Sequence, residues 1–423
     1  MRDLKALSLA AIPSSLRRLN ERLVLNRLRR MGLASRAELA KVAGISQPTA
    51  GKIIDELLAF GLIEELDGNA VGNGHADWEA PRLGRPARLL RLDTVRPRFV
   101  GIELGVDQTR VAALPLASTG DAAWSASFET GDAPAEWLRR LKAHATPIDG
   151  DSLWGVLVSV PGVVDEAGGR VLYSPNLHWT ERVQLPQLVG ETWPLPVLLL
   201  QEIRALALGH LSANPGSEDF LLVDFGEGVG GAVIEGGQLF SHPLPLSAEL
   251  GHTPVLGNDR LCGCGASGCV ETLLSRRGLL QSFAVGTRRG AGDLSALASN
   301  IANNGLPTWL GASLDAMGAI IAGALNVLGL RRVVVTGHLT ELPPVVVERL
   351  ARAVERGAMW ARFGAVICEP APRRRMAGLV AAGIDRLLVP ADPKGPLHKA
   401  ARQRMTQTAR PRRNRAARSA PLR

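Results

Sequence analysis

The chain has 423 residues, of which 46% are hydrophobic, and it carries a formal net charge of +9 at pH 7. This length exceeds that of one ordinary domain and predicts two or three, and the excess of basic residues favours a polyanionic partner. No uninterrupted apolar run reaches the roughly 18 residues that span a bilayer, and no convincing signal-peptide cleavage site follows the N-terminus, so we expect a cytoplasmic protein without a membrane partner.

Two short helices are predicted near the N-terminus. The helical spacing of apolar residues predicts the first over 20–31, and Gly32 ends it. Ser35 and Glu38 have the spacing of a capping box, which begins a second helix that ends at Gly44. The second helix is therefore brief and is followed by a tight turn.

A third helix is predicted from the capping residue Ser46 to about residue 60. Three short helices with a tight second turn are typical of a helix-turn-helix, whose last helix inserts its N-terminal part into the DNA major groove. Residues at this end that face away from the apolar stripe are predicted to bind DNA: Ser46, Gln47, Thr49 and Lys52. A helical dimerisation or protein-binding module is the alternative.

Two short strands, 62–66 and 89–92, are predicted on either side of a long loop that contains glycine and arginine. Such a loop would form a basic wing beside the helices, and we assign its Arg85 to DNA contact. A winged helix-turn-helix DNA-binding domain is therefore predicted over residues 1–92.

From residue 98 the pattern changes to short apolar strands that alternate with helices, which predicts an α/β body over 98–390. A second set of strands begins at 220–225, so we expect two lobes with a cleft between them.

The most specific motif is a cluster of three cysteines, Cys262, Cys264 and Cys269, with His252 upstream. Four nitrogen and sulfur ligands complete the tetrahedral shell of Zn²⁺, which predicts a structural zinc site with no open position for an activated water. The pattern suits a reducing compartment better than a disulfide framework. Buried free thiols are the alternative.

Residues 391–423 form a basic tail, which has eight arginines and no acidic residue from position 401 onward. The tail lacks apolar periodicity and is predicted to be disordered. It would either add nonspecific attraction to phosphates or be dispensable.

Several segments resemble the signature of the ROK family: residues 160–165 (Val-Pro-Gly-Val-Val-Asp), 174–177 (Ser-Pro-Asn-Leu), 226–231 (Gly-Glu-Gly-Val-Gly-Gly), 248–252 (Ala-Glu-Leu-Gly-His) and 262–271 (Cys-Gly-Cys-Gly-Ala-Ser-Gly-Cys-Val-Glu). Residues 35–40 and 84–86 resemble the regulator branch of this family in particular. The resemblance covers about residues 19–388. It implies a two-lobed α/β actin-like ATPase/sugar-kinase fold with an N-terminal winged helix-turn-helix.

The resemblance also implies a sugar site next to the zinc. Its residues would be Asn176, Glu202, Glu249, His252 and Glu271. Carboxylates and an amide can pair with several sugar hydroxyls in a polar cleft, which makes the assignment chemically reasonable. In an alternative interpretation, Glu249 and Glu271 only orient the zinc ligands.

The phosphate-binding elements depart from the kinase pattern of this fold. The first glycine turn has Val106, Asp107 and Gln108 in place of a glycine, a threonine and a lysine, and Glu227 replaces a threonine in the second. Glu202 stands at the position of the kinase base, where family kinases have an aspartate, and its extra methylene would displace the carboxylate. These departures oppose catalysis, and no catalytic residue is assigned.

Together these features predict a DNA-binding transcription regulator, and the family resemblance implies repression of carbohydrate uptake or catabolism genes. The body would sense a sugar or sugar derivative without phosphorylating it. The expected partners are double-stranded operator DNA, the sugar effector and further copies of the chain in a homodimer or homotetramer, because one helix-turn-helix reads few bases. The alternatives are an active ATP-dependent ROK sugar kinase and a DNA-binding regulator with an extinct sugar site.

Overall fold

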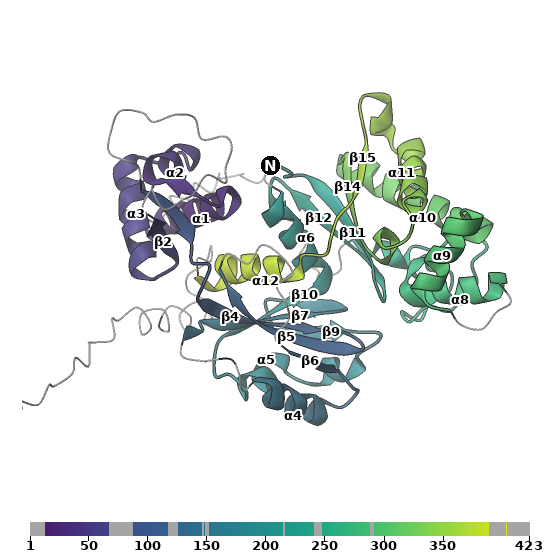
Figure 1. Cartoon of the computed structure of the whole chain (residues 1–423), viewed down its shortest axis with the longest axis horizontal. Helices are drawn as coiled ribbons and strands as arrows, with labels where there is room; N and C mark the ends of the chain where they lie inside the picture. The colour runs from purple at the N-terminus through teal and green to yellow at the C-terminus, as the bar shows by residue number, and fades with distance from the viewer. Residues whose placement is uncertain are drawn as a thin grey trace, which may run out of the picture.

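The computed structural model describes residues 13–66, 88–116, 126–145, 148, 152–214, 216–240, 248–287, 292–388 and 403. Figure 1 shows a small N-terminal module beside a body that contains two sheets. Arg85 and nearly all of the loop predicted as a wing lie outside the described residues, as does the basic tail apart from one residue.

The N-terminal module combines three helices with a small antiparallel sheet. Its elements are α1 (Pro13–Met31), β1 (Ala34–Ser35), α2 (Arg36–Val42), α3 (Gln47–Ala59), β2 (Ile63–Leu66) and β3 (Leu89–Leu92), and the strand order is β1-β3-β2. All three predicted helices are present. The first begins at Pro13, earlier than predicted. Proline is well tolerated in the first turn of a helix, so this start is compatible with the sequence.

The predicted helix caps are confirmed. The Ser35 hydroxyl accepts a hydrogen bond from the Glu38 backbone N–H at 3.2 Å, and the Glu38 carboxylate accepts from the Ser35 N–H at 2.8 Å. Ser46 caps α3 by accepting from the Thr49 N–H at 3.4 Å. These local bonds fix the starts of α2 and α3.

The first lobe of the body is a five-stranded mixed sheet in the order β10-β7-β4-β5-β6. Its elements are β4 (Pro97–Leu104), β5 (Gln108–Pro115), β6 (Ala126–Glu129), α4 (Pro134–Ala145), β7 (Gly155–Val160), β8 (Val163–Asp165), β9 (Arg170–Tyr173), η2 (His178–Arg182), α5 (Leu185–Gly190), β10 (Val197–Gln201) and α6 (Glu202–Ala213).

The second lobe repeats this plan with the strand order β13-β12-β11-β14-β15. Its elements are β11 (Phe220–Phe225), β12 (Val229–Glu235), β13 (Gln238–Leu239), η3 (Leu250–His252), α7 (Glu271–Leu274), α8 (Arg276–Thr287), α9 (Leu294–Asn304), α10 (Thr308–Leu328), β14 (Arg332–Gly337), η4 (His338–Thr340), α11 (Val345–Gly357), η5 (Met359–Arg362) and β15 (Ile367–Pro370). The predicted two-lobed α/β fold is confirmed.

The chain returns from the second lobe to the first through α12 (Arg375–Gly383), which continues as the π-helical turn η6 (Ile384–Leu388). Every residue of α12 is buried. Its contact with α6 depends on glycine: a Cβ at Gly378 would lie 1.7 Å from the Ala205 carbonyl oxygen, and one at Gly209 would lie 1.9 Å from that of Arg374. The two helices therefore meet backbone to backbone.

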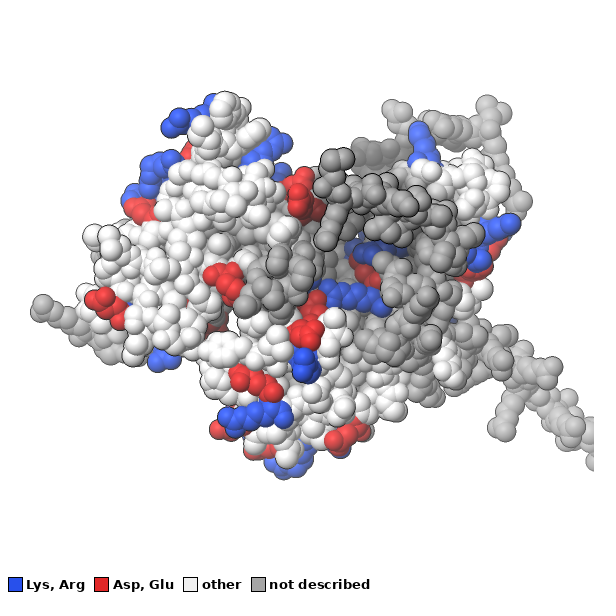
Figure 2. Space-filling view, turned by 180° about the vertical axis from the view of Figure 1, so that it is seen from behind, with Lys and Arg blue, Asp and Glu red and all other residues white. Residues whose placement is uncertain are grey.

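Helix α10 is long and apolar enough to cross a membrane by length and composition, but half of its most apolar stretch is buried inside the protein. Buried residues on it, such as Leu314, Met317 and Ile321, pack in the core of the second lobe. It is therefore placed as a core helix. Figure 2 shows acidic and basic side chains interspersed over one face of the molecule.

Candidate functional site

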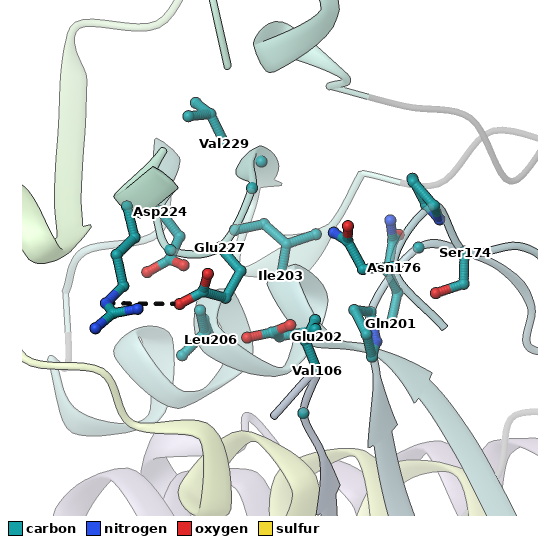
Figure 3. A pocket seen from close by; sticks show the side chains of 18 of the residues that line it. Val106, Ser174, Asn176, Gln201, Glu202, Ile203, Leu206, Asp224, Glu227 and Val229 are labelled. Atoms are coloured by element: carbon teal, nitrogen blue, oxygen red, sulfur yellow. Dashed lines mark ion pairs between the residues drawn. The ribbon is translucent and has the colours of Figure 1, made fainter. Parts of the chain in front are cut away.

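A cleft of about 500 Å³ lies between the two lobes. The first lobe contributes the turn between β4 and β5, the segment after β9 and the start of α6, whereas the second lobe contributes the turn between β11 and β12, η3 and α7. In Figure 3, Asn176 and Gln201 lie on one side of the cleft, Asp224 and Glu227 on the other, and Glu202 lies between them.

The structure brings all five residues predicted to bind sugar to this cleft: Asn176, Glu202, Glu249, His252 and Glu271. Asn176 is exposed and the others are partly buried. Burial raises the pKa of the Glu249 carboxyl, and the nearby His252 opposes this shift. One carboxylate oxygen of Glu271 accepts a hydrogen bond from the Val229 N–H at 2.9 Å, which holds α7 against β12.

Sequence reasoning missed the arginines that line the cleft, among them Arg373 and Arg375. Arg375 is buried and forms ion pairs with both Glu103 and Glu202. Burial raises the pKa of Glu202, whereas Arg375 acts to lower it. The carboxylate at the position of the kinase base is therefore already paired with a cation from its own chain.

The Arg373 side chain lies between two glycine-containing turns of the second lobe, one at Gly226 after β11 and one at Gly337 at the end of β14. Its guanidinium pairs with both oxygens of Asp224, at 2.7 and 2.9 Å, and donates to the Phe225 carbonyl at 3.2 Å. A Cβ at Gly226 would lie 2.8 Å from Arg373 Nη2, and one at Gly337 would lie 2.7 Å from it. The side chain thus fills the space between the two turns. Three consecutive arginines before an apolar helix, 373–375, were the available sequence signal.

The two acidic residues predicted to disfavour phosphate, Asp107 and Glu227, are exposed and line the cleft. Glu227 lies 3.9 Å from Arg276, the ion pair drawn in Figure 3. Arg276 partly offsets the negative charge at this turn, which the sequence argument did not anticipate.

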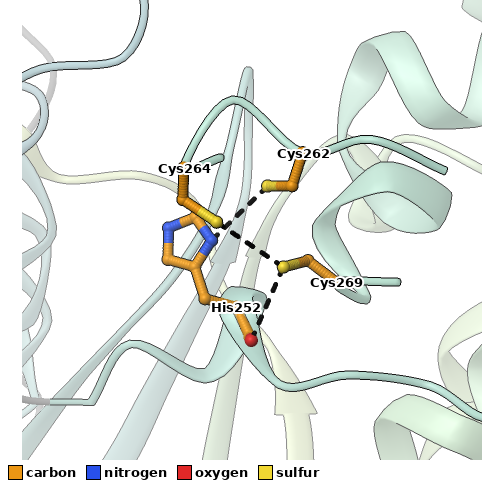
Figure 4. Close-up of side chains that lie close together, drawn as sticks. All are labelled: His252, Cys262, Cys264 and Cys269. Atoms are coloured by element: carbon orange, nitrogen blue, oxygen red, sulfur yellow. Dashed lines mark hydrogen bonds between the residues drawn. The ribbon is translucent and has the colours of Figure 1, made fainter. Parts of the chain in front are cut away.

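The residues predicted to bind metal lie together (Figure 4), and His252 among them also lines the cleft. One donor atom from each of His252, Cys262, Cys264 and Cys269 lies within 4.8 Å of the other three. The Cys264 and Cys269 sulfurs are 3.7 Å apart, and the Cys262 sulfur is 3.6 Å from His252 Nδ1. Ligands 2.3 Å from a tetrahedral centre lie about 3.8 Å from one another. The cluster can therefore hold a tetrahedral metal ion without large rearrangement.

The metal cluster and the cleft share side chains. His252 directs Nδ1 toward Cys262, and its Nε2 lies 4.0 Å from a carboxylate oxygen of Glu249. The Cys262 thiol also contacts Glu271 at 3.7 Å. Burial raises the pKa of this thiol to about 12, and a nearby cation would favour its thiolate form. The Tyr173 hydroxyl donates to the Gly263 carbonyl at 2.8 Å and ties the cysteine loop to the first lobe.

The predicted DNA-binding residues of the N-terminal module lie at and just before the start of α3. Ser46, Gln47, Thr49 and Lys52 are all exposed. The opposite face of this helix is buried through Ala50, Ile53, Ile54 and Leu57. These polar side chains are therefore accessible. Arg85 lies outside the described residues.

A family model described as "ROK family" matches residues 99–384. The xylose repressor of Caldicellulosiruptor bescii is 26% identical over 373 residues, which cover 82% of this chain and 90% of that protein. The DNA-binding transcriptional dual regulator NagC of Escherichia coli is 24% identical over 370 residues, or 81% of this chain and 86% of the relative.

Two solved structures share the fold. A ROK family transcriptional regulator, described as a homologue of the E. coli MLC protein, matches 93% of this chain and 99% of its own, with a TM-score of 0.68 and 18% identity. A ROK family glucokinase from Streptomyces griseus, solved with glucose and AMPPNP, matches 67% of this chain and 97% of its own, with a TM-score of 0.54 and 23% identity.

Proposed function

Because the chain belongs to the ROK family, we propose that it is a DNA-binding transcriptional regulator whose body senses a sugar or sugar derivative without phosphorylating it. The expected role is repression of genes for carbohydrate uptake or catabolism, in the cytoplasm. The observation that carries the proposal is a capped helix with an exposed polar face, attached to a body with a polar cleft. Relatives named as repressors, which match most of the chain, support it.

We assign the DNA-binding domain to residues 1–92, the effector and oligomerisation domain to 98–390, and a basic tail to 391–423. In this assignment Ser46, Gln47, Thr49, Lys52 and Arg85 contact operator DNA. A homodimer or homotetramer would present two helix-turn-helix units to paired half-sites, which supplies the specificity that one unit lacks.

The metal of the cysteine cluster is proposed to be Zn²⁺. Three thiolates and one imidazole are ligands that zinc favours, and a full set of four protein ligands makes the site structural rather than catalytic. When bound, the ion would fix the cysteine loop and the orientation of His252. The Nε2 side of this imidazole would then remain for the ligand in the cleft.

The sugar is proposed to bind through Asn176, Glu249, His252 and Glu271, with Glu202 at the floor of the cleft. Their carboxylate, amide and imidazole groups line one cleft and offer both donors and acceptors to sugar hydroxyls. Each hydroxyl that is buried without a partner would cost affinity, so a polar lining of this kind favours a polyhydroxylated ligand.

Phosphoryl transfer is disfavoured by the contacts of Arg373 and Arg375. A nucleotide phosphate would have to displace Arg373 from Asp224 and from both glycine turns. The general base of a kinase must accept a proton from the substrate hydroxyl, but the Glu202 carboxylate is held by Arg375. The same ion pair favours one alternative, in which Glu202 no longer contacts a ligand and the sugar site is extinct.

The proposal can be tested with the full-length protein and a duplex selected by it from a random-sequence library. Calorimetry with a panel of sugars, including D-xylose, D-glucose, N-acetylglucosamine and their 6-phosphates, is expected to find a ligand that changes the affinity for the duplex. Sugar-dependent ATP hydrolysis is expected to stay far below about 1 s⁻¹, the lower end of ordinary kinase rates. Turnover at that rate would establish a kinase, and a panel without any ligand would favour the extinct site.

A further inference from the structure

Helix α12 and its extension η6 join the cleft to the N-terminal module. Arg375, the first residue of α12, lines the cleft, and Asp385 in η6 contacts α1. The ten residue steps from Arg375 to Asp385 span about 15 Å at the α-helical rise. In Figure 1, α12 lies between the N-terminal module and the sheet that contains β4 and β7. The α12–η6 segment therefore contacts both the cleft and helix α1 of the N-terminal module.

At the cleft end, Arg375 is shared between two carboxylates. Its guanidinium contacts Glu103 from β4 and Glu202 from α6, and only 7% of its side chain is exposed. A buried guanidinium with two partners is sensitive to the loss of either one, because the remaining charges are then incompletely paired. Glu202 is the more accessible of the two carboxylates, with 32% of its side chain exposed and the cleft beside it.

At the module end, Asp385 binds two side chains of α1. One of its oxygens accepts a hydrogen bond from Asn26 Nδ2 at 3.2 Å, and the other lies 3.3 Å from Arg22 Nη2. These contacts attach the C-terminal end of the α12–η6 segment to the first helix of the DNA-binding module. α1 in turn packs on α2 and α3.

A second chain of polar contacts follows the same route. Glu166 accepts from the backbone N–H of Gln201, a cleft residue, at 3.1 Å. The same carboxylate pairs with Arg204 of α6 at 3.0 Å and with Arg386 of η6 at 2.6 Å. The residue next to Asp385 is therefore linked, through one carboxylate, to the residue next to Glu202.

The segment between these ends has little freedom to absorb a displacement. All of α12 is buried, and its backbone meets that of α6 at Gly378 and Gly209 without space for a methyl group. Close-packed interiors transmit strain, because a shift of one element must be matched by its neighbours. A displacement at Arg375 would thus reach η6 rather than be lost within the helix.

We propose that the α12–η6 segment transmits occupancy of the cleft to the DNA-binding module. A hydroxylated ligand that donates hydrogen bonds to Glu202 competes with Arg375 for that carboxylate. The change displaces α12 and alters the contacts of Asp385 with Arg22 and Asn26 on α1. Arg375 acts here as a positioning residue. The identity of the ligand and of the DNA partner rests on the proposed function, but the connection between the two ends does not.

The connection can be measured without sugar or DNA, by amide hydrogen exchange of α1 in the full chain. Glu202→Gln removes one charge beside Arg375 and is expected to change the exchange rates of α1 by about 2- to 30-fold. Asp385→Ala removes the polar contacts with Arg22 and Asn26 of α1, so the proposal predicts that Glu202→Gln has no further effect on α1 in that background. The matched control is Asp315→Ala, which breaks the pairing of an aspartate with Arg349 and Arg356 in the second lobe. In the control background the effect of Glu202→Gln should persist.

Unchanged amide exchange rates of α1 in Glu202→Gln, or an equal change with and without Asp385, would overturn the inference.

A second measurement separates the inference from the proposed function. If a sugar of the panel shifts the DNA affinity of the wild type and of Asp315→Ala, that shift should be lost in Asp385→Ala, while calorimetry still detects sugar binding. A shift of the same size in Asp385→Ala would reject transmission through α12–η6 and leave the regulator intact. If no sugar acts on the wild type, the proposed function fails, and the exchange experiment still decides the inference.

Discussion

At the scale of single residues, the metal cluster and the ligand cleft depend on the same side chains. His252 and Glu271 both line the cleft and both contact Cys262. A ligand that contacts either residue therefore also contacts a neighbour of the metal cluster.

We predict that Cys264→Ser lowers the metal content below one ion per chain. A ligand set with three donors binds zinc more weakly, and the free energy of unfolding is expected to fall by about 3 kcal/mol or more, since loss of a metal is among the large destabilising changes. Metal analysis and thermal unfolding measure both effects. Cys368→Ser is the matched control, because Cys368 lies outside the cluster. Full metal content in Cys264→Ser would exclude Cys264 as a ligand.

At the scale of elements, the helix-turn-helix was predictable because its signals are local. The capping residues Ser35 and Ser46 act within three or four positions of themselves, and the sequence contains all partners. The cleft arginines were not predictable in this way. Arg375 pairs with residues 272 and 173 positions away, and Arg373 pairs with one 149 positions away. Only the tertiary fold brings those charges together.

The proposed DNA-binding helix α3 yields a prediction about two kinds of DNA contact. Lys52→Ala is expected to weaken binding to all sequences alike and to reduce the salt slope by about 1, as expected for a phosphate contact. Gln47→Ala should instead cost about 1–3 kcal/mol at one base position, as expected for a base contact. Binding isotherms at several salt concentrations distinguish these results. Lys142→Ala, on α4 of the body, is the control. If neither variant changes the isotherm, α3 is not the recognition helix.

The contact between α6 and α12 yields a prediction about stability. Gly378→Ala would place a methyl group 1.7 Å from the Ala205 carbonyl oxygen, so the helices must separate. We expect a loss of about 1–3 kcal/mol in the free energy of unfolding, measured with denaturant. Gly323→Ala, in α10 with no atom within 4 Å of the new methyl group, should stabilise the protein by up to about 1 kcal/mol. Equal stability of the two variants would show that the helices are not in backbone contact.

At the scale of the whole molecule, the two-lobed fold could be predicted because alternating strands and helices limit the possible architectures. The family signature then located the metal cluster and the cleft at 248–271 and 174–177. The return of the last helix to the first lobe could not be predicted, because the periodicity of α12 does not specify which helix it contacts. The need for glycine at position 378 becomes clear only in the fold, where the Ala205 carbonyl oxygen leaves no space for a side chain.

The proposed coupling between sugar and DNA must be reciprocal. If a sugar changes the affinity for the selected duplex by a certain factor, the duplex must change the affinity for the sugar by the same factor, typically about 5- to 150-fold. Calorimetry with and without the duplex measures one direction, and DNA titrations with and without sugar measure the other. Unequal factors at equilibrium would mean that oligomerisation or another linked step contributes.

The position of Arg373 has a consequence for which small molecules in the cell can affect this protein. Because its guanidinium already lies against Gly226 and Gly337 and is held by Asp224, we expect adenine nucleotides to bind poorly in this part of the cleft. We therefore expect the protein's DNA affinity to follow the sugar concentration and to be the same in cells with high and low ATP levels.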